Sequence, residues 1–83
     1  MKITLKDGES FEARTSLGVV EKMKGASMFT EFKTAEAYME MVVRNAWCFF
    51  GVGLDVSGKT ENERARALIN ELSRTGLARK EQK

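Results

Sequence analysis

Apolar and polar side chains alternate at the start of the chain, a pattern that predicts a β-hairpin. The side chains expected to share its buried face are Ile3, Leu5, Phe11 and Ala13. A two-residue turn at Asp7-Gly8 would place Phe11 on the opposite face from Ile3, because a shift of one residue reverses every side chain. A three-residue loop over residues 6–8 pairs Ile3 with Phe11 and puts Gly8 at the left-handed position of the turn. We therefore predict the three-residue loop.

Apolar residues at helical spacing follow the hairpin and predict a first helix over residues 16–24. Thr15 is suited to its N-cap, and Gly25 is suited to its end. The expected inward side chains are Leu17, Val20 and either Met23 or Lys24. The loop that follows, residues 26–33, is expected to pack down as a lid because it carries three large apolar side chains, Met28, Phe29 and Phe32.

A second helix is predicted after Thr34, its N-cap, and runs to about Phe49, with Gly51 at its end. Its polar side chains form one narrow stripe, made of Glu36, Glu40 and Arg44. The remaining faces are apolar, and a helix that is apolar on most sides is normally buried. We therefore expect this helix to be the central one, covered on most sides.

The third helix has the clearest boundaries in the sequence. Thr60 followed by Glu63 fits a capping box, in which each residue satisfies a backbone N–H of the other at the helix start. The apolar stripe of this helix consists of Ala65, Leu68, Ile69 and Leu72. Gly76 is suited to end the helix, because glycine readily adopts the left-handed conformation found there.

Residues 52–56 alternate between large apolar residues and Gly53 or Asp55, which favours a short third strand beside the hairpin. The sequence therefore predicts an α+β fold with an N-terminal hairpin, two helices, this candidate strand and a capped C-terminal helix. Hydrophobic residues make up 42% of the 83-residue chain, enough for one compact core. We expect one small domain over residues 1–77, followed by a polar and basic tail over residues 78–83.

The residue inventory excludes several classes of chemistry. The chain has no histidine and a single cysteine, Cys48, which removes histidine-based zinc sites, Ser-His-Asp and Cys-His nucleophiles, and disulfides within the chain. Its carboxylates are scattered, and no close pair of them can be placed from the sequence. We therefore expect a non-catalytic protein of the reducing cytoplasm, without a cofactor or a metal. The most apolar region, residues 37–54, contains Glu40 and Arg44, so we expect no membrane partner.

One segment matches a nucleotide-binding motif. Residues 53–60, GLDVSGKT, fit the phosphate-loop pattern, in which Lys59 would reach the phosphates and Thr60 would hold Mg²⁺. Only 23 residues follow Thr60, too few to complete the parallel sheet that such loops need. Val56 also stands where the usual loop has a further glycine, and its branched side chain opposes the left-handed backbone. We therefore favour a simple turn before the third helix, with nucleotide binding as the weakest alternative.

Trp47 is the most informative single residue. At 100° per residue it lies within about 20° of Glu36, on the polar stripe of the second helix with Glu40 and Arg44. Either another part of the fold covers Trp47, or it is an anchor for a partner with charges beside it. The second interpretation predicts a protein-interaction module whose interface includes Trp47, Arg44 and Glu40, and whose partner is another protein or a second copy.

The C-terminal part of the chain supports an alternative, a nucleic-acid-binding accessory domain. Residues 59–83 carry 7 basic and 4 acidic side chains, in a chain whose total net charge is +2. Arginine and asparagine on one helix face can read base edges, and a basic tail can contact phosphates. The candidate contacts are Arg66, Asn70, Arg74, Arg79 and Lys80. Nearby glutamates would repel a nucleic-acid backbone, so protein interaction is the preferred hypothesis.

Several runs resemble small bacterial proteins of unknown function, some of them from mobile-element or phage-like gene neighbourhoods. The runs that carry this resemblance are ITLKDG at residues 3–8, YM at 38–39, GVGLDVSG at 51–58, and the later ENERARAL and GLA. The resemblance implies no activity, ligand or site residue. The opening segment also looks like the first hairpin of ubiquitin-like TGS domains, a similarity that ends by Arg14.

Overall fold

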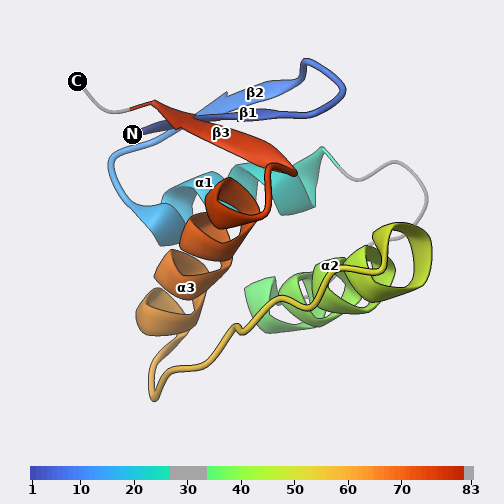
Figure 1. Cartoon of the computed structure of the whole chain (residues 1–83). Coiled ribbons are helices and arrows are strands. Elements are labelled where there is room, and N and C mark those ends of the chain that lie inside the picture. Colours follow the sequence, from blue (N-terminus) through green and yellow to red (C-terminus); the bar gives the residue numbers. More distant parts are fainter. Residues whose placement is uncertain (27–33, 82–83) are drawn as a thin grey trace.

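A three-stranded antiparallel sheet and three helices make up the structure, a computed structural model that describes residues 1–26 and 34–81. In chain order the elements are β1 (Lys2–Leu5), β2 (Ser10–Glu12), α1 (Ser16–Gly25), α2 (Ala35–Phe50), α3 (Glu61–Arg74) and β3 (Ala78–Glu81). Helices α1 and α3 pack against one face of the sheet, and α2 packs against these two helices on the side away from it (Figure 1). This arrangement confirms the predicted α+β class.

The hairpin has the predicted register. Ile3 pairs with Phe11, and the Leu5 N–H donates to the carbonyl of Glu9 at 2.7 Å, which leaves residues 6–8 as the loop. Gly8 has a φ of +96°, the left-handed conformation that the loop requires. The buried face of β1 is then fixed, and Ile3 is fully buried in the core.

The third strand lies where the sequence predicted a tail. β3 pairs antiparallel with β1 and gives the strand order β2-β1-β3, so the N-terminal strand is in the middle. Ala78 is buried and Lys80 is half-buried on the inner face, with the Lys80 ammonium 3.3 Å from the side-chain oxygen of Asn70. A lysine stem can cover apolar surface while its charge stays in water. For this reason the sequence reads as polar although it forms a strand.

The strand predicted over residues 52–56 is wrong. Among the described residues this segment pairs with no strand. Its alternation is nevertheless visible, because Leu54 is buried while Gly53 and Asp55 are exposed. Leu54 belongs to the core cluster, and Leu54 and Val56 line a groove together with Met39 and Val43 of α2. Alternating apolar and polar residues indicate that one side of an extended segment is buried, but they do not identify the part of the fold that covers that side.

The core lies between the sheet and the helices. The predicted inward stripe of α3 is confirmed, since Ala65, Leu68, Ile69 and Leu72 are all buried. In α1 the prediction is partly wrong, because Leu17 is only half-buried. The buried apolar residues of α1 are Val19, Val20 and Met23. The buried positions of α1 are therefore spaced by one, three and four residues, as one helix face requires.

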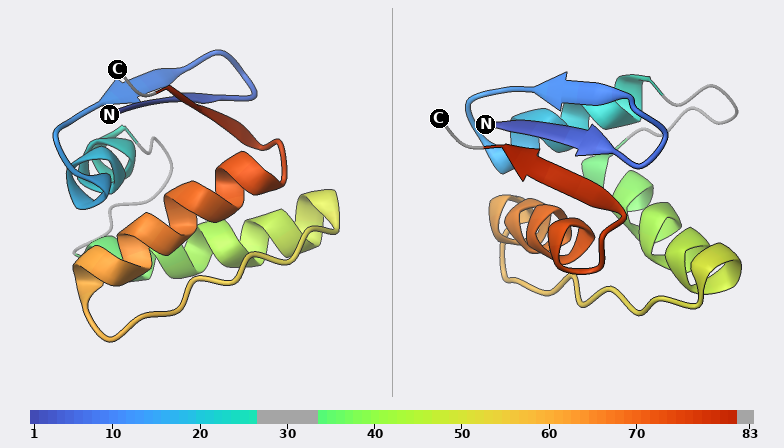
Figure 2. Two further views of the ribbon diagram at one scale, coloured as in Figure 1. Left: turned by 60° about the vertical axis from the view of Figure 1, so that its left-hand side comes forward. Right: turned by 45° about the horizontal axis from the view of Figure 1, so that its top comes forward.

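Helix α2 is not the covered central helix that its composition predicted. Its boundaries agree closely with the prediction, with Thr34 as N-cap and Gly51 in the left-handed conformation at its end. Only four of its side chains are buried, Ala35, Tyr38, Met39 and Ala46. Its C-terminal turn extends beyond the helices that it packs on, and the chain then turns back along it toward α3 (Figure 2). The predicted lid with Met28, Phe29 and Phe32 lies outside the described residues.

The capping box of α3 is formed as predicted and should make a measurable contribution to stability. The Thr60 hydroxyl accepts from the Glu63 N–H at 3.1 Å, and the Glu63 carboxylate accepts from the Thr60 N–H at 3.0 Å. Thr60→Ala should lower the free energy of unfolding by about 1 kcal/mol in urea denaturation, because it removes the side-chain acceptor. Thr60→Ser, which keeps the acceptor, should cost little. Equal stability of all three proteins would place the start of α3 elsewhere.

Candidate interaction surface

The last turn of α2 exposes three aromatic side chains, which we call the aromatic end of α2: Trp47, Phe49 and Phe50. Their exposed fractions are 67%, 75% and 57%, and Cys48 between them is also exposed. Successive helix residues point about 100° apart, so these side chains surround the end of the helix and do not share one face. An aromatic residue usually supplies a large part of a core, and here three of them face solvent.

Backbone hydrogen bonds hold the aromatic end in a helical conformation. The N–H groups of Gly51 and Val52 donate to the carbonyls of Trp47 and Ala46, both at 3.1 Å. The Phe50 ring also lies 5.9 Å from the Lys6 ammonium of the hairpin loop, near the limit for a cation–π contact. The exposed side chains therefore project from a fixed helix end.

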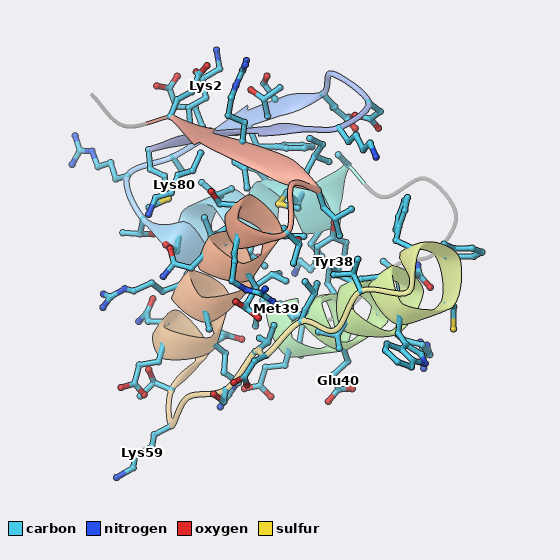
Figure 3. All side chains as sticks on the ribbon, in the orientation of Figure 1. Lys2, Tyr38, Met39, Glu40, Lys59 and Lys80 are labelled. Carbon is cyan, nitrogen blue, oxygen red and sulfur yellow. The ribbon has the colours of Figure 1, made fainter. Side chains whose placement is uncertain are left out.

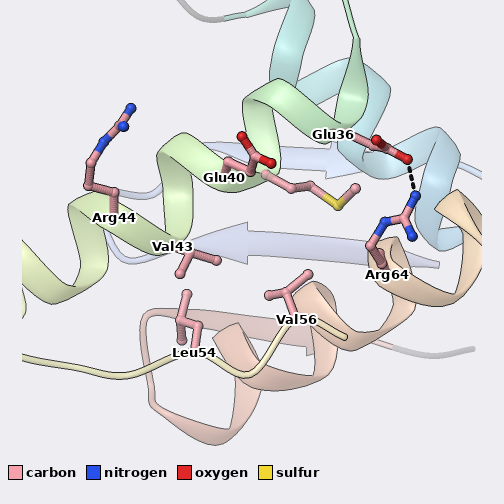
Figure 4. A pocket seen from close by; sticks show the side chains of 8 residues that line it. Glu36, Glu40, Val43, Arg44, Leu54, Val56 and Arg64 are labelled. Carbon is pink, nitrogen blue, oxygen red and sulfur yellow. Dashed lines mark hydrogen bonds and ion pairs between the residues drawn. The ribbon is translucent and has the colours of Figure 1, made fainter. Parts of the chain in front are cut away.

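A groove of about 340 Å³ runs beside the same helix, between α2 and the extended residues 52–56. Its apolar lining consists of Met39, Val43, Leu54 and Val56. Its charged lining consists of Glu36, Glu40, Arg44 and Arg64. Figure 4 shows Val43 opposite Leu54 and Val56, the ion pair of Glu36 with Arg64 at one end, and Arg44 at the other end pointing away from the apolar side chains.

The extended segment on one side of this groove is held to α3 by the carboxylate of Glu71. Glu71 accepts the Asp55 backbone N–H at 2.8 Å and the Arg74 guanidinium at 2.7 and 3.0 Å. Arg74 also donates to the carbonyl of Gly53 at 3.3 Å. The hydrogen bonds from Arg74, followed by the one from Asp55, lower the pKa of Glu71 to about 2. The Glu71–Arg74 pair thus fixes residues 53–55, which carry the buried Leu54.

The structure brings together the residues predicted from the second helix. Glu40, Arg44 and Trp47 are all exposed on one stripe of α2, and Glu40 is seen pointing away from the rest of the fold (Figure 3). Their role in an interface stays a prediction. The sequence analysis did not single out Phe49 and Phe50, because it expected every face of this helix outside the polar stripe to be covered. The available signal was the run of aromatic residues directly before Gly51, because side chains that surround a helix end cannot all face one core.

The predicted nucleic-acid contacts do not form one surface. Arg74 is held by Glu71, and Lys80 points from the inner side of β3 toward Asn70. Arg79 is the strand neighbour of Lys80, so it points to the opposite face of the sheet, where it lies 3.6 Å from a Glu81 oxygen. Arg66 is exposed on α3. These candidate side chains are therefore spread over two faces, and several already contact acidic or polar partners.

The segment that matches the phosphate-loop pattern has a different geometry. The N–H groups of Lys59 and Thr60 both donate to one Glu63 oxygen, at 2.7 and 3.0 Å. A phosphate loop directs such N–H groups at the phosphates. The segment also follows a helix and an extended stretch, where a phosphate loop follows a strand. The glycine of the G-K pair, Gly58, allows close packing, because a Cβ there would lie 2.7 Å from that of Glu63.

Within the described residues, no three His, Cys, Asp or Glu side chains lie close enough together to hold a metal ion. No helix in the described ranges has both the length and the apolar character needed to cross a membrane. Comparison of the chain with protein-family models, with curated proteins and with solved structures finds no match. The function is therefore inferred from the geometry of the surface alone.

The contribution of the Glu71–Arg74 pair to the stability of the protein should depend on pH. Because the pKa of Glu71 is lowered from 4.5 to about 2, its contribution to stability is complete above pH 4.5 and is lost as the pH falls toward 2. Glu71→Gln should therefore lower the melting temperature at neutral pH, and the difference from the wild type should close between pH 4.5 and 2. Glu21→Gln is the matched control, since it removes an ion pair of the same spacing, to Lys24, that carries no backbone contact. A Glu71→Gln effect no larger than the control, or independent of pH, would contradict this role.

Proposed function

We propose that this chain is a small, non-catalytic protein-interaction module that binds through the aromatic end of α2 and the adjoining side chains of Glu40 and Arg44. The exposure of Trp47, Phe49 and Phe50 on a single helix turn carries the proposal. Burying an exposed aromatic side chain against a partner removes a large apolar area from water, which makes such residues the usual anchors of protein interfaces.

The surroundings of these aromatic side chains support an interface. Contiguous exposed apolar groups on a small protein commonly mark a binding site, whereas isolated ones do not. Glu40 and Arg44 supply a charged rim beside Trp47, the arrangement of many interface hot spots. The surface offers aromatic anchors, one acidic side chain and one basic side chain, and the chain has no histidine to act as a base. We therefore assign it a binding role.

The cysteine within this surface fits the proposed location in the cytoplasm. Cys48 is exposed and unpaired between two exposed aromatic residues. An exposed thiol persists in a reducing compartment and tends to oxidise outside it.

Nucleic-acid binding is the alternative function, and it rests on the positive charge of residues 59–83. Its candidate side chains lie on two faces, and Arg74 is engaged by Glu71. Any such binding should therefore be electrostatic, insensitive to sequence and strongly weakened by salt. Tight, sequence-dependent binding that is lost in Arg66→Ala would favour this alternative over a protein-interaction module.

The proposal predicts a separation between binding and stability. Trp47→Ala should weaken binding roughly tenfold or more, because the lost side chain is an anchor. Phe49→Ala should weaken binding less, because Phe49 points to another side of the helix. The same changes should alter the free energy of unfolding little, because both side chains are exposed in the free chain. Binding can be measured by quantitative capture of partner proteins on the immobilised chain and by self-association in sedimentation experiments.

The matched control is Lys59→Ala, an exposed change at the other end of the extended segment. It should leave both binding and stability as in the wild type. If the double variant of Trp47 and Phe49 captures and self-associates like the wild type, the aromatic end is not the binding surface. If that variant instead loses much of its stability, these residues belong to the fold.

A further inference from the structure

The order of side chains along the exposed stripe of α2 is such that two antiparallel copies of the stripe would bring acidic side chains opposite basic ones. Glu40, Arg44 and Trp47 lie within about 60° of one another around the helix axis. Ala37 and Cys48 lie together along one edge of this stripe, and both are exposed. Glu36, at the end of the groove, lies along the other edge. An acid, a base and an aromatic anchor thus follow one another along a single helix face.

We infer that the partner of this surface is a second copy of the chain, bound through its own α2 in antiparallel orientation; this inference rests on the proposed function. A two-fold axis between Glu40 and Arg44 places Glu40 opposite Arg44 of the other copy, and the symmetry repeats this pair. The same axis places Trp47 opposite Glu36 and Cys48 opposite Ala37. A parallel pairing would set Glu40 against Glu40 and Arg44 against Arg44, which charge repulsion opposes.

Each copy offers a place for the tryptophan of the other. The Arg64 guanidinium lies at the end of the groove beside Glu36, and Met39 contributes to the apolar lining of the groove. The groove volume of about 340 Å³ falls in the range of small-ligand pockets, about 300–1,000 Å³, so it can admit part of an indole ring. An arginine over an indole face adds a cation–π contact.

The charges that this pairing needs are available in the free chain. Glu36 already pairs with Arg64, but among the described residues no ion pair joins Glu40 or Arg44 to any other side chain. Both can therefore form ion pairs across the interface without breaking a contact of the monomer. Opposite charges that meet across an interface fix its register and suppress wrong arrangements.

Charge reversal tests this pairing in a way that separates it from effects within one helix. Glu40→Arg and Arg44→Glu each place like charges opposite each other in a homodimer, so each variant alone should dimerise at least roughly tenfold more weakly than the wild type. Mixed in equal amounts, the two variants should recover a heterodimer, because each glutamate then faces an arginine. Both variants carry like charges within their own helix, so recovery on mixing cannot arise within one chain. Native mass spectrometry distinguishes all three species.

A cross-link provides an independent readout of the same geometry. Under mild oxidation, Ala37→Cys should form a covalent dimer through Cys48 of the other copy, and the same change combined with Cys48→Ser should not. Within one chain the two positions are about 16 Å apart along the helix, too far for a disulfide. The wild type should not cross-link, because in this pairing its two Cys48 residues are about 18 Å apart.

A wild-type chain that stays monomeric at all concentrations overturns the inference. A wild-type dimer whose charge-reversed variants do not recover on mixing, or whose Ala37→Cys variant does not cross-link, overturns the antiparallel pairing. In each of these cases, Trp47-dependent capture of another protein would still support the interaction module. Loss of that dependence as well would end the proposed function.

Discussion

The burial of the apolar stripe of α3 is the constraint on which the other elements depend. Ala65, Leu68 and Ile69 are fully buried, with the sheet and α1 and α2 arranged around them. The capping box at Thr60 and Glu63 fixes the residue at which the helix begins. The buried residues Ala65, Leu68, Ile69 and Leu72 share one face of the helix because they are spaced by three, four and seven residues from Ala65. The cap stabilises the first turn of the helix that carries this face.

Both segments that flank α3 follow from this placement. After the left-handed Gly76, the chain enters β3 and reaches the free edge of β1, which makes the N-terminal strand central. Before α3, the Glu71–Arg74 pair and Leu54 hold the extended segment along the helices. Among the described residues, the core cluster contains none of the side chains of the last turn of α2. A chain of this size has limited apolar surface available to cover a helix of 16 residues, about 24 Å long, and that turn remains uncovered.

Local chemistry made much of the fold predictable. Turn and cap residues act over a few positions, so the hairpin loop, the capping box and the helix boundaries followed from the sequence. The partner of an extended segment is decided over long distances, and for this reason residues 52–56 were mistaken for the third strand. The actual third strand, β3, looked like a polar tail in the sequence, because Lys80 covers the core with its aliphatic stem but carries a charge. Helical periodicity placed Trp47 on the polar stripe of α2. The exposure of Phe49 and Phe50 depends on where the core ends along α2, and its signal in the sequence is the aromatic run before Gly51, because side chains that surround a helix end cannot all face one core.

The exposure of Trp47 in solution tests most directly whether the fold leaves the end of α2 uncovered. Trp47 is the only tryptophan, so its fluorescence reports this position alone. At concentrations low enough to keep the chain monomeric, the emission should be red-shifted, and acrylamide should quench it readily. If copies pair as inferred, raising the concentration should shift the emission to the blue and reduce quenching. A blue-shifted emission that resists quenching at every concentration would place Trp47 in the core and contradict the interaction surface.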